Sequence, residues 1–386
     1  MNFPIYLDSH ATTPVDPRVL KEMMPYFTEK FGNASSIDHS FGTEAADVVD
    51  KSRKKIARCI NASPEDIIFT SGATESNNIV LQGLAGKDPF KNHIITCVTE
   101  HKSILDTCKH LETIGKKVTY VPVDNQGVVD LELLENAISE RTALISVMTA
   151  NNEIGTIAPI KEIGEIAHKH YVPFHTDATQ AVGHIPFDVG AYNIDFASIS
   201  AHKIYGPKGV GALFFKSDGL VGKPSPLFFG GGHERGVRSG TLNVSGIVGL
   251  ASALELSIEL MKEENNRYRE MSKLLINNFL EEVSPAELNG HPLQRLTHNI
   301  NISFDNVENK ALIHAVKDKL AISTGSACTT LNVEPSHVIT ALGVGTVRAF
   351  NAIRLGLGRF NTFEEIQFSA DYIIEKVKKL RKLKLS

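Results

Sequence analysis

Polar side chains that could do chemistry follow the carboxyl ends of several predicted strands. Lys203 comes after the strand-like residues 196–200, and Asp177 comes after residues 173–176. In an open α/β sheet, ligands bind outside the carboxyl ends of the strands, so both side chains can contribute to one site. A lysine there can form a Schiff base with a carbonyl compound. The alternatives are a solvated surface lysine and an aspartate that caps the next helix.

This lysine and this carboxylate match the two protein groups that pyridoxal phosphate requires. The lysine binds the cofactor covalently, and the carboxylate keeps the pyridine nitrogen protonated so that the ring can accept electrons. Ser200 and His202 flank the lysine, and both can contact a phosphate. The pair therefore favours a pyridoxal phosphate site.

A phosphate site is predicted where residues 67–70 lead into a helix over 71–84. Gly72 marks a turn there, and Ala73 and Thr74 follow it. Backbone N–H groups at a helix N-terminus favour a phosphate, although Ser and Thr are also ordinary helix caps. His101 follows another strand and could stack on a cofactor ring, whereas a lone histidine is more often structural.

The elements that position these groups alternate along the chain. Seven strands are expected, at 67–70, 94–98, 117–123, 143–148, 173–176, 196–200 and 211–215. Helical patterns over 71–84 and 102–111 separate some of them. Such alternation predicts an α/β fold with a mostly parallel sheet flanked by helices.

Residues 246–282 contain almost no Pro or Gly and predict one long helix that links two domains. After it come a strand over 297–304, a helix over 309–320, a strand over 352–357 and a helical tail from 362. We expect a large cofactor-binding domain over 13–260 and a smaller α+β domain over 261–386, joined by residues 1–12.

Composition narrows the function class. The net charge is −4, which argues against direct nucleic-acid binding through whole-chain electrostatics. No signal peptide or membrane span is evident, so the expected compartment is the cytoplasm. The four cysteines have no Cys-x-x-Cys spacing, which argues against a disulfide scaffold or a zinc site, and no metal ligands are predicted.

Cys328 differs from the other three cysteines in its surroundings. It lies in the small, polar sequence Gly325-Ser326-Ala327-Cys328-Thr329-Thr330, whereas Cys97 lies in an apolar run. Buried structural cysteines normally occupy apolar runs, so a mobile loop with a reactive thiol is the better interpretation here.

Together these motifs resemble the cysteine desulfurases, a class V aminotransferase-like group of fold-type I pyridoxal phosphate enzymes, in the branch with a mobile cysteine loop. The resemblance spans nearly the whole chain. Its main carriers are Ala11-Thr12-Thr13-Pro14, Ser71-Gly72-Ala73-Thr74-Glu75, Thr99-Glu100-His101, Asn151-Asn152-Glu153-Ile154-Gly155, Asp177-Ala178-Thr179-Gln180, Ser200-Ala201-His202-Lys203, residues 230–241, Gly325-Ser326-Ala327-Cys328 and Ile353-Arg354-Leu355.

The resemblance implies a role for each site residue. Lys203 would bind the cofactor, Asp177 its pyridine nitrogen and Gln180 its phenolate oxygen. The phosphate would be held by Ala73, Thr74, Ser200 and His202, with Thr241 supplied by the partner subunit of a homodimer. His101 would stack on the ring and move protons. Asn152 and Arg354 would hold the carboxylate of the L-cysteine substrate, and Cys328 would be the nucleophile.

The implied reaction removes sulfur from L-cysteine, which leaves L-alanine and a persulfide on Cys328. An acceptor in iron–sulfur assembly, tRNA thiolation or DNA phosphorothioation would then take the sulfur. A selenocysteine lyase and a small-amino-acid aminotransferase of the same fold are alternatives. A cofactor-free scaffold is a weaker alternative, because Lys203, Asp177 and His101 are all present. An NAD enzyme is weaker still, since no Gly-x-Gly-x-x-Gly follows an early strand. The basic residues from Lys376 to Lys384 indicate either a solvated helix end or a docking site for an acidic partner or nucleic acid.

Overall fold

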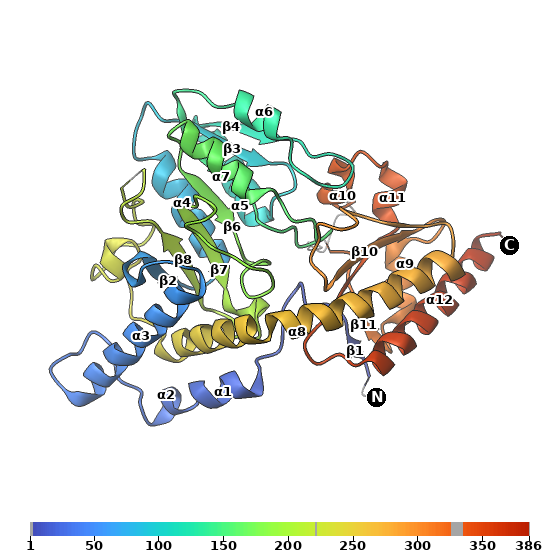
Figure 1. The fold of residues 1–386 in the computed structure, drawn as a ribbon, viewed down its shortest axis with the longest axis horizontal. Coiled ribbons are helices and arrows are strands. Elements are labelled where there is room, and N and C mark those ends of the chain that lie inside the picture. The colour runs from blue at the N-terminus through green and yellow to red at the C-terminus, as the bar shows by residue number, and fades with distance from the viewer. Residues whose placement is uncertain (1–2, 221, 326–334, 386) are drawn as a thin grey trace.

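The computed structural model describes residues 3–220, 222–325 and 335–385. Within them, a seven-stranded sheet has the order β2-β8-β7-β6-β5-β3-β4 (Figure 1). Its strands are β2 (Ile67–Thr70), β3 (His93–Cys97), β4 (Lys117–Val121), β5 (Thr142–Ser146), β6 (Phe174–Asp177), β7 (Phe196–Ser200) and β8 (Gly211–Phe215). Strand β8 runs antiparallel to both of its neighbours, β2 and β7, and the other neighbouring pairs in this sheet are parallel. The predicted α/β fold with a mostly parallel sheet is confirmed.

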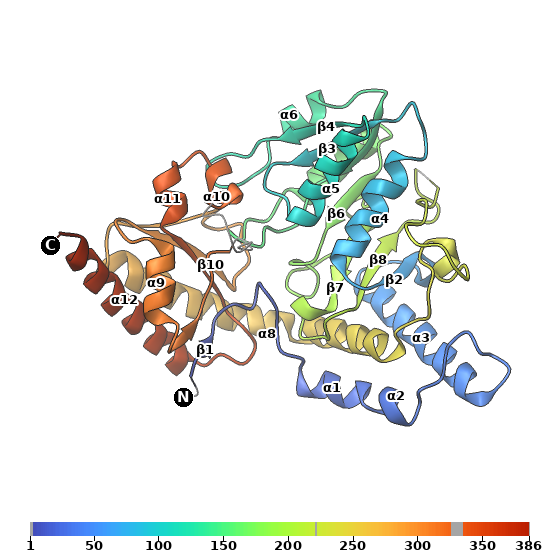
Figure 2. The same cartoon turned by 180° about the vertical axis from the view of Figure 1, so that it is seen from behind.

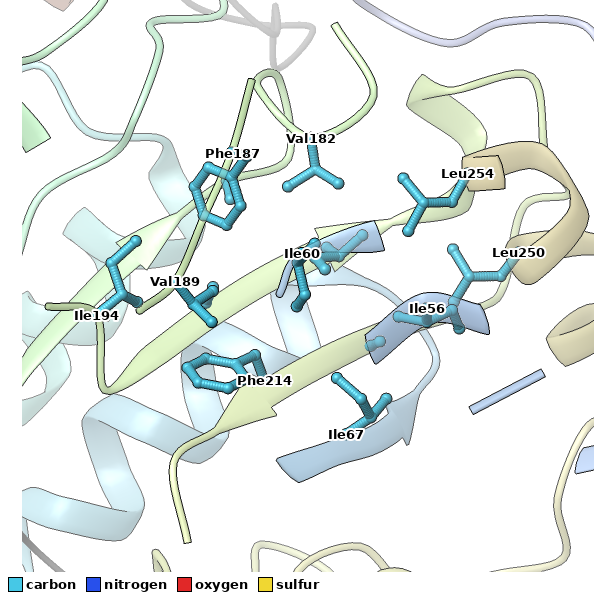
Figure 3. Close-up of a cluster of buried hydrophobic side chains, with 14 of the residues drawn as sticks. Ile56, Ile60, Ile67, Val182, Phe187, Val189, Ile194, Phe214, Leu250 and Leu254 are labelled. Carbon is cyan, nitrogen blue, oxygen red and sulfur yellow. The ribbon is translucent and has the colours of Figure 1, made fainter. Parts of the chain in front are cut away.

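Helices cover both faces of this sheet, because alternate strand residues point to opposite sides (Figures 1 and 2). One cluster joins Ile67 and Phe214 to α3 (Ser40–Cys59), α7 (Ile160–Lys169) and the first half of α8. Figure 3 shows part of it, with Ile56 of α3 and Leu250 of α8 beside Ile67. The opposite face, which includes Ile68 and Leu213, packs on α4 (Ala73–Ala85) and α5 (Lys102–Thr113).

A second, three-stranded sheet is separate from the seven-stranded sheet and has the strand order β12-β10-β9. Its strands are β9 (Ala286–Leu288), β10 (Asn299–Phe304) and β12 (Ala352–Gly356). Helices α9 (Asn309–Val316) and α12 (Phe363–Leu385) share its core cluster. The short strand β1 (Ile5–Tyr6) pairs with β11 (Leu320–Ala321), which brings the amino end to this side of the molecule (Figure 1).

Helix α8 (Val244–Glu282) runs between the two core clusters (Figure 1). Its residues up to Leu254 contribute to the first cluster, and those from Tyr268 contribute to the second. An 18-residue window of α8 has a mean hydropathy of 1.5, but 67% of that window is buried inside the molecule, as expected of a core helix. The division into two domains at residues 260 and 261 stays a prediction.

Five further short helices complete the described chain: α1 (Pro17–Met23), α2 (Pro25–Thr28), α6 (Leu131–Asn136), α10 (His337–Ala341) and α11 (Thr346–Phe350). Helices α3 and α7 were not predicted from the sequence. The helix predicted over 309–320 is too long, since α9 ends at Val316 and Leu320 belongs to β11 (Leu320–Ala321). Leu320 pairs with Ile5 there, and this long-range contact cannot be read from local periodicity.

Candidate active site

A cavity of about 850 Å³ lies at the carboxyl ends of the large sheet's strands. The structure brings ten of the predicted site residues to its wall: Ala73, Thr74, His101, Asn152, Asp177, Gln180, Ser200, His202, Lys203 and Arg354. Thr241 is exposed and does not line this cavity. Cys328 lies outside the described residues, while Gly325 before it and His337 after it both line the cavity.

Lys203 lies in the single helical turn that follows β7. Its Nζ donates to the backbone oxygens of His10 and Ala11, the latter at 2.8 Å. Burial and the nearby Arg354 guanidinium lower its pKa to about 8, against the opposing charge of Asp177. At pH 7 about one-tenth of this amine is therefore unprotonated, far more than in a solvated lysine, and the unprotonated form is the nucleophile.

Asp177 is the last residue of β6 and is 5% exposed. Its Oδ2 accepts a hydrogen bond from Asn77 Nδ2 at 2.8 Å, and its Oδ1 accepts one from the backbone N–H of Thr179 at 3.0 Å. Residues 178–183 form turns rather than a helix, so the carboxylate is not a helix cap. Two neutral donors thus orient a buried carboxylate at the cavity.

The amino end of α4 opens onto the same cavity. Gly72 precedes the helix with φ of +149°, and no side chain of the described residues caps this end. A Cβ at this glycine would lie 3.6 Å from Ser200 Oγ. The N–H groups of the first turn and the Ser200 hydroxyl therefore offer donors to one anion.

Two histidines at the cavity wall are held in their neutral form. Burial and the nearby Lys203 lower the pKa of His202 to about 4. Burial also lowers the pKa of His101, whose Nδ1 accepts the backbone N–H of Ser103 at 3.1 Å. A backbone N–H can only donate, so the neutral His101 ring carries its proton on Nε2.

Arg354 reaches the cavity from β12 of the smaller sheet. Its Nη2 forms an ion pair with Asp8 Oδ1 at 2.7 Å, and its Nη1 donates to the backbone oxygen of Asn152 at 2.9 Å. Five further polar residues at or beside the cavity were not predicted from the sequence: Asp8, His10, Asn77, Glu153 and His337. They lie in segments that only the tertiary fold brings together, although Glu153 stands within a quoted motif and Asn77 within the predicted helix over 71–84.

The other cysteines are poor nucleophiles. Burial raises the pKa of both Cys97 and Cys108 to about 12, and that of Cys59 to about 11. A thiol in that range is almost wholly protonated near neutral pH. In the described part of the chain, no group of three or more His, Cys, Asp or Glu side chains is arranged to hold a metal ion.

The chain is similar to known proteins over almost its full length. The family model for aminotransferase class-V matches residues 5–368. A cysteine desulfurase IscS from Rickettsia felis is 50% identical over 383 residues, which cover 99% of this chain and 93% of that protein.

Solved structures agree with this similarity. A NifS-like protein superposes with a TM-score of 0.91 at 39% identity, covering 97% of this chain and 100% of its own. A structure of SspA in complex with cysteine gives a TM-score of 0.81 at 36% identity, covering 92% of this chain and 99% of its own. The chain therefore belongs to the aminotransferase class-V family, within its group of cysteine desulfurases, which depend on pyridoxal phosphate.

Proposed function

We propose that this chain binds pyridoxal phosphate in the 850 Å³ cavity and uses it to remove sulfur from L-cysteine. One observation carries the proposal: a partly buried lysine with a pKa of about 8 shares the cavity with a buried carboxylate and an uncapped helix end. These are the covalent anchor, the partner of the ring nitrogen and the phosphate site that the cofactor requires.

The donor set of the cavity fits the cofactor. The backbone N–H groups of Ala73 and Thr74, Ser200 Oγ and the ring of His202 would hold the phosphate. Asp177 would hold the pyridine nitrogen, and its two neutral donors leave its negative charge available for that contact. When bound, pyridoxal phosphate supplies an electron sink that stabilises negative charge at the substrate α-carbon.

Lys203 and His101 would move protons in the reaction. Lys203 Nζ, when it is not bonded to the cofactor, would accept the proton of the substrate α-carbon. Its pKa of about 8 suits it to accept and return a proton near neutral pH. His101 would donate through Nε2, because the backbone N–H of Ser103 occupies Nδ1.

Arg354 and Asn152 would orient the substrate through its carboxylate. A guanidinium can hold a carboxylate through two parallel hydrogen bonds. The Arg354 side chain is 5% exposed and its Nη2 is paired with Asp8 Oδ1, which fixes the direction of the guanidinium. Asp8 would also repel a substrate carboxylate that approached from its own side.

Cys328 would take the sulfur. Its thiolate would attack the substrate sulfur, so that a sulfur–sulfur bond forms on the protein as the carbon–sulfur bond of the substrate breaks. The carbon skeleton would then take up a proton and leave as L-alanine. The proposal is supported by Gly325 and His337, which line the cavity on either side of the segment that contains Cys328.

The persulfide would pass to an acceptor protein in the cytoplasm. An iron–sulfur scaffold and a thiolation enzyme are both candidate acceptors. The functional unit would be a homodimer in which Thr241 reaches the phosphate in the partner's cavity. The exposure of Thr241, and its absence from the cavity wall of its own chain, support that arrangement.

Two variants test the proposal with purified enzyme, L-cysteine and a reductant. We expect Cys328→Ser to keep the visible absorption of the bound cofactor but to lose sulfide and alanine formation. We expect Lys203→Ala to lose the visible absorption of the lysine-bound form as well as activity. The buried Cys108→Ser is the matched control and should remain active. Normal turnover by Cys328→Ser would exclude Cys328 as the nucleophile.

The same assay separates the alternative activities. Alanine formed from cysteine without a keto acid excludes an aminotransferase. Comparing kcat/KM for cysteine and selenocysteine distinguishes a desulfurase from a selenocysteine lyase. A purified protein that takes up no pyridoxal phosphate would support a scaffold instead.

A further inference from the structure

His10 makes a two-point contact with Gln180 at the cavity wall. The backbone oxygen of His10 accepts from Gln180 Nε2 at 3.1 Å, and its ring Nδ1 lies 3.0 Å from Gln180 Oε1. Both residues are buried, at 1% and 5% exposed. The whole carboxamide of Gln180 is therefore held by one residue from a distant part of the chain.

Elementary hydrogen-bonding rules fix the orientation of both side chains. A backbone oxygen can only accept, so the Gln180 atom facing it is the nitrogen. The remaining Gln180 oxygen can also only accept, so His10 must carry a proton on Nδ1. Burial and the nearby Arg354 charge hold the pKa of His10 well below its ordinary value, so the ring is neutral and its Nε2 carries no proton.

Stacking holds the ring of His10 in place. It stacks on His298 with ring centroids 4.5 Å apart, and His184 lies on His298 at 4.4 Å. His184 Nε2 in turn lies 3.0 Å from the backbone oxygen of Lys203, to which it donates. Within the described residues, this buried row of histidines contacts both Gln180 and Lys203.

We infer that His10 is a positioning residue that turns one N–H of Gln180 toward the bound cofactor. The Gln180 amide has two N–H bonds, and His10 occupies one of them together with the amide oxygen. The second N–H therefore remains as a hydrogen-bond donor for a ligand in the cavity. This inference rests on the proposed function and on the role that the resemblance implies for Gln180, which is contact with the phenolate oxygen of pyridoxal phosphate.

The pH midpoint of the visible absorption of the holoenzyme tests the inference. A donor on the phenolate oxygen favours the more negative form of the cofactor, so a misaligned Gln180 should raise that midpoint. We expect His10→Leu to raise it by about 0.5 to 1 pH unit, which corresponds to the loss of one hydrogen bond. We expect His10→Asn to keep the wild-type midpoint, because asparagine can place an N–H near the Nδ1 position.

His298→Phe is the matched control, since it keeps an aromatic ring in the stack and does not contact Gln180; its midpoint should also equal that of the wild type. An unchanged midpoint in His10→Leu, or equal shifts in His10→Leu and His10→Asn, would overturn the inference alone. A wild-type protein without cofactor absorption would overturn the proposed function too. If His10→Leu does not fold, nitrogen-15 NMR of wild-type protein labelled at histidine measures which ring nitrogen of His10 carries the proton. A ring protonated only on Nε2 would contradict the inference.

Discussion

The chemistry of Lys203 depends on the groups around its Nζ. A solvated lysine has a pKa of roughly 10.4 and is almost fully charged near neutral pH. Here burial and Arg354 disfavour the charge more than Asp177 and Asp8 favour it, which gives a pKa of about 8. The same amine can therefore accept and release a proton near neutral pH and can also act as a nucleophile.

This pKa predicts how the apoenzyme takes up pyridoxal phosphate. Only the neutral amine attacks the aldehyde, so the rate of absorption change on adding the cofactor should rise with pH and level off above about 8. Stopped-flow mixing at values from about pH 6 to about pH 10 measures the rate on both sides of that pKa. Arg354→Leu should move the profile to higher pH, because it removes a positive charge near Nζ. A rate that does not depend on pH would contradict this account of Lys203.

At the scale of one element, α4 shows how a turn creates an anion site. The chain leaves β2 at Thr70 and reaches the helix through Gly72, whose φ of +149° few side chains tolerate. Glu75 Oε2 accepts the backbone N–H of Ser71 at 2.7 Å and so stabilises the turn before the helix. The N–H groups of the first helical turn remain uncapped by side chains in the described chain.

Gly72→Ala should therefore weaken cofactor binding. A side chain strains the backbone at this φ, so the first turn of α4 should shift and raise the Kd for pyridoxal phosphate by about tenfold, from a strain of about 1–3 kcal/mol. Equilibrium dialysis or fluorescence titration of the apoenzyme measures it. Gly86→Ala, at the other end of α4 with an ordinary φ of −90°, is the control and should bind as the wild type does. Equal affinities for both variants would show that this turn does not control phosphate binding.

At the scale of the whole molecule, Arg359 connects three distant segments. Its Nη1 pairs with Asp16 Oδ2 at 2.9 Å, and its Nε pairs with Glu264 Oε1 at 2.5 Å. Asp16 precedes α1, Glu264 lies on α8 between the two core clusters, and Arg359 follows β12. All three side chains are buried.

Arg359→Leu should destabilise the protein strongly. Removing the arginine leaves Glu264 without this partner and Asp16 with only the exposed Arg18, so we expect a loss of about 3–5 kcal/mol in the free energy of unfolding. Urea unfolding of the holoenzyme, followed by circular dichroism and by cofactor absorption, measures it. Arg58→Ala removes a surface ion pair with Glu255 and should cost less than about 1 kcal/mol. Similar small losses in both variants would contradict a central role for Arg359.

Local patterns predicted the strands that carry the site. Each predicted strand of the large sheet appears in the structure within a few residues, because fully buried strands are short continuous apolar runs. In open α/β sheets, ligands bind at the carboxyl ends of the strands, and this rule predicted that Lys203 and Asp177 would share one site. Both residues line the cavity. Helix α3 was not predicted.

Periodicity within single segments was enough to predict the α/β class and the long helix, and the resemblance to cysteine desulfurases named ten residues that line the cavity. Only the tertiary structure decided that Asp8 faces Arg354 and that His10 holds Gln180. Such contacts join residues 346 and 170 positions apart, and nothing in the spacing of either segment encodes the other. The pKa of Lys203 belongs to the same category, because it depends on burial and on charges that several segments bring together.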